Sequence, residues 1–305
     1  GTTSRGLGDV YKRQEYISKS KFPIVIKADG LAAGKGVTIA HSAEEAHKAL
    51  DDAMQKKIFG SAGTKVVIED FLQGEEASFI VLCDGKKTIP FASSQDHKAR
   101  DNNDLGPNTG GMGAYSPAPI VTEEIHKQVM EKIIKPTIDG LKSEGITYKG
   151  FLYAGLMIKN SEISVLEFNC RFGDPETQPI LMRMESDLAE ICLLAAKGNL
   201  NEREISWTKD SALGVVIASK GYPFEYEKNK EINNLENENP RQKVFHAGTK
   251  TQEGKVLSNG GRVLCVTALG STLLDSKNLA YQKVKNIDWE EGFYRDDIGD
   301  KAIKS

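Results

Sequence analysis

A glycine-rich loop between two β-branched runs, in the stretch FPIVIKADGLAAGKGVTIA (residues 22–40), constrains the fold more than any other feature. It resembles a phosphate-binding loop, but it is not a P-loop. That motif requires four residues between its glycines and a Ser or Thr after the lysine. Here only three residues separate Gly30 from Gly34, and Gly36 stands where the hydroxyl residue belongs, after Lys35.

The loop does not match a dinucleotide-binding fingerprint either. Its G-x-G fits, but Ile39 stands where the third glycine belongs, and residues 37–40 favour a strand rather than the helix that the fingerprint opens. The pattern therefore predicts strand, loop and strand. Backbone N–H groups of such a loop can turn toward an anion, and Lys27 and Lys35 add positive charge. The alternative is an ordinary hairpin with an exposed lysine.

The composition excludes several classes of protein. A chain of 305 residues is long enough for two or three structural units, and a net charge of −3 gives no electrostatic footprint for nucleic acid or membranes. Four cysteines are scattered without a C-x-x-C motif, which argues against a zinc site or a disulfide framework. We therefore expect a cytoplasmic protein that binds neither nucleic acid nor membranes.

Hydrophobic periodicity predicts an α/β (α+β) chain followed by a smaller C-terminal α+β unit. Strands are expected at 65–71, 76–85, 86–94, 151–159 and 162–169, and beyond Trp207 at 212–219, 243–249 and 261–270. Helices are expected from a capping box at Ser42 to about Gln55, from Thr122 to Gly145 with an interruption near Pro136, from about Glu176 to Lys197, and over 271–285. Residues 95–121 show no period, and residues 1–14 are left out of the fold prediction as an unrelated leader.

A carboxylate and an amide stand two residues apart in the stretch SVLEFNCRFGDPETQP (residues 164–179). Glu167 and Asn169 share one face of a predicted strand, because side chains alternate along a strand. Two adjacent oxygen ligands suit a hard divalent cation that keeps its other positions for water and phosphates. The alternative is a solvent-facing strand surface. Arg171, Asp174 and Glu176 follow in a loop where charged groups can meet a substrate.

The stretch IEDFLQGEEASF (residues 68–79) can supply the other end of a nucleotide site. Backbone groups of residues 69–72 could bond an adenine edge, and Glu75 or Glu76 could bond the ribose hydroxyls. A common surface hairpin is the alternative.

Eight motifs in this order resemble the phosphoribosylamine–glycine ligase family of the ATP-grasp superfamily, from about residue 15 to the end. They are IKADGLAAGKGV, VIEDFLQGEEASF, SSQDHK, GPNTGGMGAYSP, GFLYAGLMI, EFNCRFGDPETQP, VFHAGT and NGGRVLCVTALG. The resemblance implies an ATP-grasp fold with a smaller C-terminal α+β domain, in which the strand–loop–strand is a lid over ATP. It further implies the domains 15–73 (lid subdomain), 74–206 (large subdomain) and 207–305 (C-terminal domain).

The resemblance also implies roles for individual residues, carried over position by position. Nucleotide contacts are expected from Lys27, Gly30, Gly34, Lys35, Gly36, Glu69, Asp70, Phe71, Leu72 and Glu76. Glu167 and Asn169 match the ligands of Mg²⁺ or Mn²⁺. Substrate contacts are expected from Asn108, Thr109, Gly110, Gly111 and Met112, and catalytic roles from Arg171 and Asp174.

The implied reaction joins glycine to 5-phosphoribosylamine at the expense of ATP, through glycyl phosphate. The family carries a Rossmann-like domain before the position of Glu15, so we expect this chain to be a fragment with doubtful activity, from an enzyme that is monomeric when full length. Two alternatives remain. One is a non-catalytic nucleotide-binding remnant, and the other is a different ATP-grasp ligase that joins a carboxylate to an amine.

Overall fold

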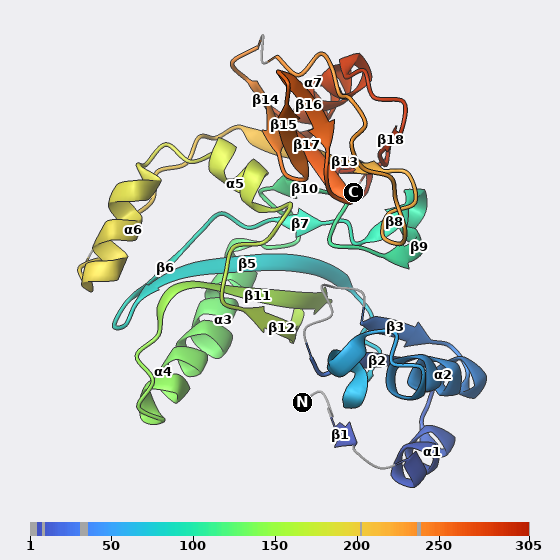
Figure 1. The fold of residues 1–305 in the computed structure, drawn as a ribbon. Coiled ribbons are helices and arrows are strands. Elements are labelled where there is room, and N and C mark those ends of the chain that lie inside the picture. The colour runs from blue at the N-terminus through green and yellow to red at the C-terminus, as the bar shows by residue number, and fades with distance from the viewer. Residues whose placement is uncertain (1–4, 8–9, 31–35, 202, 237–238, 305) are drawn as a thin grey trace. The chain divides into compact units, whose positions relative to one another are not determined.

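The computed structural model describes residues 5–7, 10–30, 36–201, 203–236 and 239–304, with side chains from residue 15 onward (Figure 1). The chain divides into two compact units, Gly1–Gln73 (unit 1) and Gly74–Ser305 (unit 2). Each unit is described by itself.

Unit 1 is built on a four-stranded antiparallel sheet in the order β1–β4–β2–β3. Its strands are β1 (Arg5–Leu7), β2 (Ile24–Ala28), β3 (Val37–Ala40) and β4 (Val66–Asp70). Its helices are α1 (Val10–Lys19), α2 (Ala43–Leu50), a π-helical continuation (Asp51–Gln55) and a 3₁₀ turn (Gly60–Thr64). Alternate residues of β2 and β4 face α2, and Ile24, Ile26 and Ile68 are buried against Ala46 and Leu50.

The strand–loop–strand prediction is confirmed, because the loop leads from β2 into β3 and the two strands pair. The predicted capping box also forms in part. The Ser42 side chain accepts a hydrogen bond from the Glu45 N–H, while the Glu45 carboxylate accepts one from the His41 N–H. Gly34 and Lys35 lie outside the described residues.

Residues 1–14, which the fold prediction excluded as a leader, contain secondary structure. Strand β1 pairs with β4, with Arg5 opposite Ile68 and Leu7 opposite Val66. Helix α1 begins at Val10 and continues past residue 15. Part of the expected leader therefore belongs to the sheet of unit 1.

Unit 2 contains a large antiparallel sheet in the order β12–β11–β5–β6. Its strands are β5 (Glu75–Asp84), β6 (Thr88–Pro90), β11 (Lys149–Lys159) and β12 (Glu162–Asn169). These pairings confirm the predicted hairpin of residues 151–169, which turns at Asn160 and Ser161, and the predicted turn at Gly85.

Alternation along β5 separates the two faces of this sheet. Ala77, Phe79 and Val81 face one way and pack against a long helix, while Ile80 and Leu82 face the other way. The long helix consists of α3 (Glu123–Val129), a π-helical segment (Met130–Ile134) and α4 (Lys135–Ser143). The opposite face is covered by α5 (Thr177–Met182) and α6 (Leu188–Lys197), so the helix predicted over 176–197 is divided in two (Figure 1).

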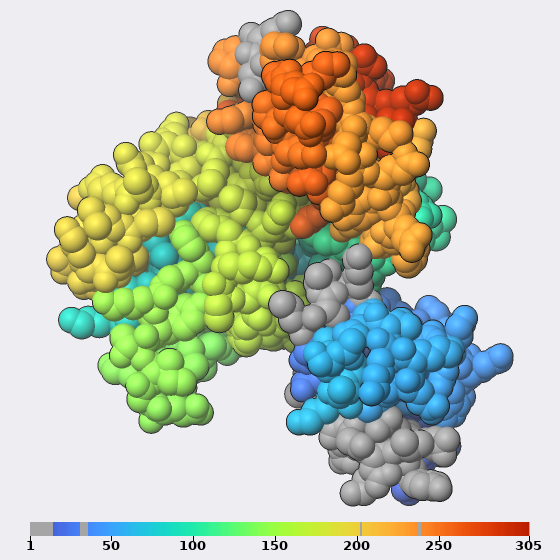
Figure 2. All heavy atoms as spheres, in the orientation of Figure 1, coloured from blue at the N-terminus to red at the C-terminus, as the bar shows by residue number. Residues whose placement is uncertain are grey.

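A second sheet, in the order β14–β17–β13–β10–β7 with β18 on β13, carries the C-terminal part of unit 2. Its strands are β7 (Gln95–Asp96), β10 (Gly113–Ser116), β13 (Ser211–Ser219), β14 (Gln242–His246), β17 (Arg262–Gly270) and β18 (Gly292–Phe293). Helix α7 (Leu273–Asn286) buries Ala280, Tyr281 and Val284 on this sheet. In the space-filling view the orange and red C-terminal residues pack directly on the rest of unit 2 (Figure 2).

The second sheet crosses the position of the domain boundary predicted between residues 206 and 207, because β10 and β13 are neighbours. It also places short strands within residues 95–121, where the sequence shows no period. The remaining elements are β8 (Ala99–Asp101), a 3₁₀ turn (Asn102–Asp104), β9 (Leu105–Asn108), β15 (Thr249–Gln252), β16 (Lys255–Ser258) and α8 (Asp300–Lys304). Among the described residues, no helix is long and apolar enough to cross a membrane.

Candidate functional site

Unit 1 holds two of the predicted nucleotide residues in an ion pair. Lys27 of β2 and Glu69 of β4 lie 2.5 Å apart, Nζ to Oε2, and their side chains are 23% and 22% exposed. Asp70 ends β4, and the half-buried Phe71 and Leu72 follow it. The sheet register therefore brings the predicted phosphate lysine to the start of the predicted adenine segment.

The two described glycines of the predicted nucleotide loop, Gly30 and Gly36, are fixed by backbone contacts. The Gly30 N–H donates to the Ala62 carbonyl at 3.1 Å, and a Cβ on Gly30 would lie 2.5 Å from the Ala62 Cα. The Gly36 carbonyl accepts a hydrogen bond from the Ala28 N–H at 2.8 Å. Glycine is required at the exit of β2 because no side chain fits against residue 62.

In unit 2, Glu167 and Asn169 lie side by side at the end of β12. The Asn169 Nδ2 donates to the Glu167 Oε1 at 3.1 Å, so the two side chains share one face as the sequence predicts. Opposite them on β11 stand Gly155 and Tyr153. A Cβ on Gly155 would lie 3.3 Å from the Glu167 Cγ, so glycine leaves room for the carboxylate.

The carboxylate and amide oxygens fit a hard divalent cation such as those that bind nucleotide phosphates. Within the described ranges, no cluster of three or more Asp, Glu, His or Cys side chains could enclose a metal ion. An ion held by Glu167 and Asn169 would therefore take its remaining ligands from water and phosphate oxygens.

A buried polar chain continues from this pair across the same face of the sheet. Ser78 of β5 stands opposite Gly155, and its hydroxyl lies 3.0 Å from the Tyr153 hydroxyl. The Ser78 hydroxyl donates to the Glu176 Oε1 at 2.9 Å. Burial, together with the charges of Glu176 and Asp96, raises the pKa of Tyr153 well above its usual range. Tyr153 is therefore neutral and can serve as a hydrogen-bond donor at the edge of the site.

A lysine among carboxylates lies at the neighbouring end of β5. The Lys98 ammonium donates to the Glu76 carboxylate, and although burial opposes it, the charges of Asp96 and Glu76 raise the Lys98 pKa well above its usual range. Burial raises the pKa of Asp96 to about 7. The positive charge of Lys98 opposes this increase, and the negative charges of Glu176 and Glu76 add to it. Asp96 and Glu76 thus share one lysine.

The glycine turn (Gly110–Gly111) and the loop after β12 both contact one arginine, Arg262. The Arg262 Nη1 donates to the Gly110 carbonyl at 2.6 Å and to the Asp174 carbonyl at 2.6 Å, and Nη2 donates to the Asp174 Oδ2 at 3.1 Å. The Asp174 Oδ1 accepts a hydrogen bond from the Gln178 Nε2 at 3.1 Å. The predicted catalytic Asp174 and the predicted substrate-binding Gly110 are therefore neighbours in the structure.

Comparison with known proteins identifies the family. The model of the phosphoribosylglycinamide synthetase ATP-grasp (A) domain matches residues 2–177, and that of the C domain matches residues 212–301. The chain belongs to the phosphoribosylglycinamide synthetase family. The ATP-grasp fold predicted from the sequence is confirmed.

Named relatives agree with this assignment. The phosphoribosylamine–glycine ligase of Salmonella typhimurium is 56% identical over 292 residues, which cover 95% of this chain and 68% of the relative. That of Pasteurella multocida is 53% identical, over 94% of this chain and 67% of the relative. The crystal structure of the Thermotoga maritima ligase matches with a TM-score of 0.88 and 33% identity, over 97% of this chain and 74% of that one.

A more distant likeness supports the fold alone. The biotin carboxylase domain of the Hydrogenobacter thermophilus 2-oxoglutarate carboxylase matches with a TM-score of 0.72 at 14% identity, over 94% of this chain and 61% of that one. The match extends the ATP-grasp architecture beyond the synthetase family.

Two of the predicted substrate contacts are buried. Met112 packs against Ala218 and Tyr222, its N–H donates to the His97 carbonyl, and its carbonyl accepts from the Val216 N–H. Thr109 is also buried, and its hydroxyl donates to the Lys98 carbonyl.

The remaining predicted residues lie at the surface. Asn108 ends β9 and is half-buried. Arg171 is exposed after β12, and its Nη1 donates to the carbonyl of Phe172 at 2.8 Å. An exposed guanidinium suits an anionic substrate group.

Sequence reasoning missed Ser78, Lys98, Tyr153 and Arg262. Lys98 and Arg262 lie in motifs that carried the family resemblance, SSQDHK and NGGRVLCV, but no role was assigned to them. A polar residue on the buried face of β5 was the available signal for Ser78, because Ile80 and Leu82 on that face are apolar.

Proposed function

We propose that this chain carries the phosphoribosylamine–glycine ligase activity of its family. ATP, glycine and 5-phosphoribosylamine are converted to glycinamide ribonucleotide, ADP and phosphate. The observation that carries the proposal is the Glu167–Asn169 pair at the polar end of the large sheet, within a chain that matches the ligase family over most of its length.

The chemistry requires activation of a carboxylate, which is a poor acyl donor. The glycine carboxylate attacks the γ-phosphorus of ATP and releases ADP, giving glycyl phosphate. The amine of phosphoribosylamine then attacks the acyl carbon, phosphate leaves with the bonding electron pair, and the amine loses a proton. The released proton passes to solvent.

Each part of the site has a physical task in this scheme. In unit 1 we assign Lys27, Gly30, Gly36 and the segment Glu69–Leu72 to nucleotide contacts, and Gly34 and Lys35 to the same loop. In unit 2, Glu76 keeps its predicted role as a ribose contact. Glu167 and Asn169 would hold Mg²⁺ or Mn²⁺, whose chemistry is to neutralise the phosphate oxygens as charge develops. Arg171, Asp174 and the turn at Asn108–Gly111 are assigned to the acceptor substrates. The protein is proposed to be cytoplasmic, and monomeric when full length.

The test separates the two chemical steps. With ATP, Mg²⁺ and glycine, hydroxylamine should trap glycyl phosphate as glycine hydroxamate. When phosphoribosylamine replaces hydroxylamine, glycinamide ribonucleotide and ADP should form in equal amounts. Replacing glycine by alanine should abolish both products. ATP binding without either product would identify a nucleotide-binding remnant, and product from another carboxylate and amine would identify a different ligase.

A matched pair of variants tests the metal assignment. Glu167→Gln should lower turnover roughly a hundredfold, about 3 kcal/mol of transition-state stabilisation. Glu162→Gln, at the other end of the same strand, should leave turnover unchanged because Glu162 is exposed and remote from the pair. Equal turnover of the two variants at saturating Mg²⁺ would contradict the assignment.

A further inference from the structure

Arg262 connects three segments that lie far apart in the sequence. It is the first residue of β17, and its guanidinium reaches the glycine turn at Gly110–Gly111 and the loop that contains Asp174. Its Nη1 also lies 3.4 Å from the Gly111 carbonyl. The Arg262 side chain is 21% exposed, whereas that of Asp174 is 52% exposed. A partly buried arginine therefore holds an open carboxylate.

The two glycines of the turn are explained by this packing. A Cβ on Gly110 would lie 2.8 Å from the guanidinium carbon of Arg262. A Cβ on Gly111 would lie 2.4 Å from the Pro175 Cδ, and its φ of +111° disfavours any other residue. The turn is thus pressed against both Arg262 and the segment after Asp174.

The N–H groups of the same turn are already committed. The Gly110 N–H donates to the Tyr222 hydroxyl at 2.9 Å, and the Gly111 N–H donates to the Thr109 hydroxyl at 3.0 Å. These two N–H groups cannot bind a phosphate without losing those bonds. The glycines allow close approach to Arg262, and the Asp174 side chain of the loop that Arg262 holds remains open to a substrate.

We infer that Arg262 is a positioning residue, which fixes Asp174 and its loop against the Gly110–Gly111 turn and so sets the geometry of the acceptor-substrate site. This rests on the proposed function. A guanidinium donates in a planar fork that one ammonium cannot reproduce, because the bonds go to two carbonyls and one carboxylate in different directions. Arg262→Lys should therefore fail to restore the arrangement.

The first experiment compares Arg262→Lys and Arg262→Gln with Arg241→Gln. Arg241 is a matched control, since it pairs with the Asp210 Oδ2 at 2.7 Å and bonds the Leu269 carbonyl at 3.3 Å, away from the glycine turn. Both Arg262 variants should raise KM for glycine or phosphoribosylamine about tenfold or more, which is about 1.4 kcal/mol. KM for ATP should stay within about twofold, and Arg241→Gln should change none of these constants.

A second measurement does not depend on activity. Amide hydrogen exchange should quicken together in residues 108–113 and 171–176 of Arg262→Gln, and in neither segment of Arg241→Gln. Asp174→Asn should also change acceptor KM less in the Arg262→Gln background than in the wild type, because one arginine couples the two residues.

The outcomes separate this inference from the proposed function. A wild-type chain that forms neither hydroxamate nor ligation product contradicts the proposed function, and the exchange data then decide on Arg262 alone. Unchanged exchange in both segments, equal effects on the KM of ATP and acceptor, or restoration by lysine would overturn the positioning role.

Discussion

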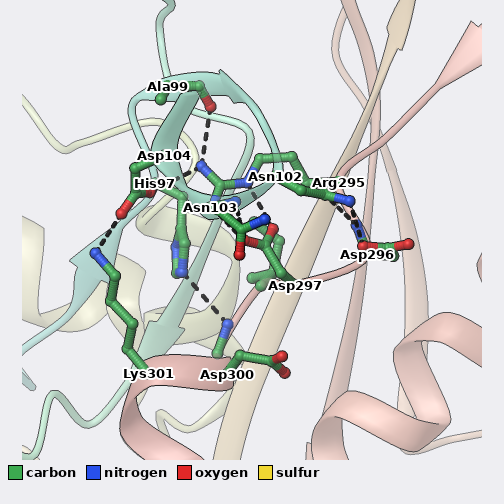
Figure 3. Close-up of polar contacts among 12 residues, drawn as sticks. His97, Ala99, Asn102, Asn103, Asp104, Arg295, Asp296, Asp297, Asp300 and Lys301 are labelled. Atoms are coloured by element: carbon green, nitrogen blue, oxygen red, sulfur yellow. Dashed lines mark hydrogen bonds and ion pairs between the residues drawn. The ribbon is translucent and has the colours of Figure 1, made fainter. Parts of the chain in front are cut away.

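Arg295 offers the sharpest test of how unit 2 is held together. It is almost completely buried, at 1% exposure, and it ties the C-terminal segment to residues 99–104 (Figure 3). Its Nε and Nη2 donate to the two carboxylate oxygens of Asp297, each at 2.8 Å. Its Nη1 donates to Asp104 Oδ1 and to the Ala99 carbonyl, both at 3.0 Å.

Arg295→Met keeps much of the side-chain volume but removes the charge. The Asp297 side chain, at 17% exposure, then loses its bidentate partner, whereas Asp104, at 35%, keeps Lys301. Removing one partner of a buried pair typically costs about 3–5 kcal/mol. Because Asp104 remains paired, we expect the free energy of unfolding of unit 2 to fall by about 3 kcal/mol, at the lower end of that range.

The matched control is Lys301→Met. Lys301 pairs with the same Asp104, but its side chain is 62% exposed, so its loss should cost no more than about 1 kcal/mol. Urea unfolding followed by tryptophan fluorescence suits the comparison, because both tryptophans, Trp207 and Trp289, lie in unit 2 and the signal does not report unit 1.

The pH dependence gives a second check with a definite sign. Burial raises the pKa of Asp297, but the hydrogen bonds and charge of Arg295 outweigh it and hold the pKa below its usual value. Burial also raises the pKa of Asp104, and Lys301 and Arg295 together lower it below its usual value. Such carboxylates stabilise the fold above their unfolded pKa of about 4, and this stabilisation is lost as the pH falls through the folded values. The difference in the free energy of unfolding between the wild type and Arg295→Met should therefore decrease below about pH 4. An Arg295 variant within 1 kcal/mol of the Lys301 variant at pH 7 would refute the reasoning.

Two further predictions concern stability. Burial, and secondarily the charge of Arg295, lowers the pKa of His97 to about 4, so His97 should destabilise the fold as the pH falls from about 6.5 to 4. Urea unfolding at pH 7 and pH 4.5 should therefore show a smaller loss of the free energy of unfolding for His97→Gln than for the wild type. Gly140→Ala in α4 should raise the free energy of unfolding by about 0.5–1 kcal/mol, because nothing lies within 4 Å of the new Cβ. Gly111→Ala should lower it, since its Cβ would meet Pro175; opposite signs for the two glycines in urea unfolding check this.

Local patterns were enough for the regular elements. The apolar runs of residues 76–85 and 151–159 predict strands β5 and β11, which helices cover on both faces of the sheet, and residues 162–169 complete the hairpin as β12. The Ser42 and Thr122 caps begin helices as predicted, since a hydroxyl that accepts a backbone N–H acts within four residues. Glu167 and Asn169 were found for the same reason: their relation needs only the two-residue repeat of a strand.

Long-range partners could not be read from a single sequence. Strand β10 has only Gly113–Ser116, and it forms because β13 pairs with it about a hundred residues later. Arg262 meets Gly110 and Asp174 only once β17, the glycine turn and the loop after β12 are in place. No local period marks such a meeting point, so residues 95–121 looked irregular and Arg262 had no assigned role.

The boundary between core and site nevertheless follows one face of β5. Ile80 and Leu82 on that face pack under α5 and α6, whereas Ser78 and Glu76 continue it with polar groups. Burying a hydroxyl costs free energy unless it is bonded, and Ser78, at 1% exposure, meets both Tyr153 and Glu176. These partners come from β11 and from the start of α5, so the site is shaped only when three segments of unit 2 have assembled. The change from apolar to polar residues along this face of β5 therefore marks the border between the hydrophobic core and the candidate site. Once the buried face is known, the sequence shows this change.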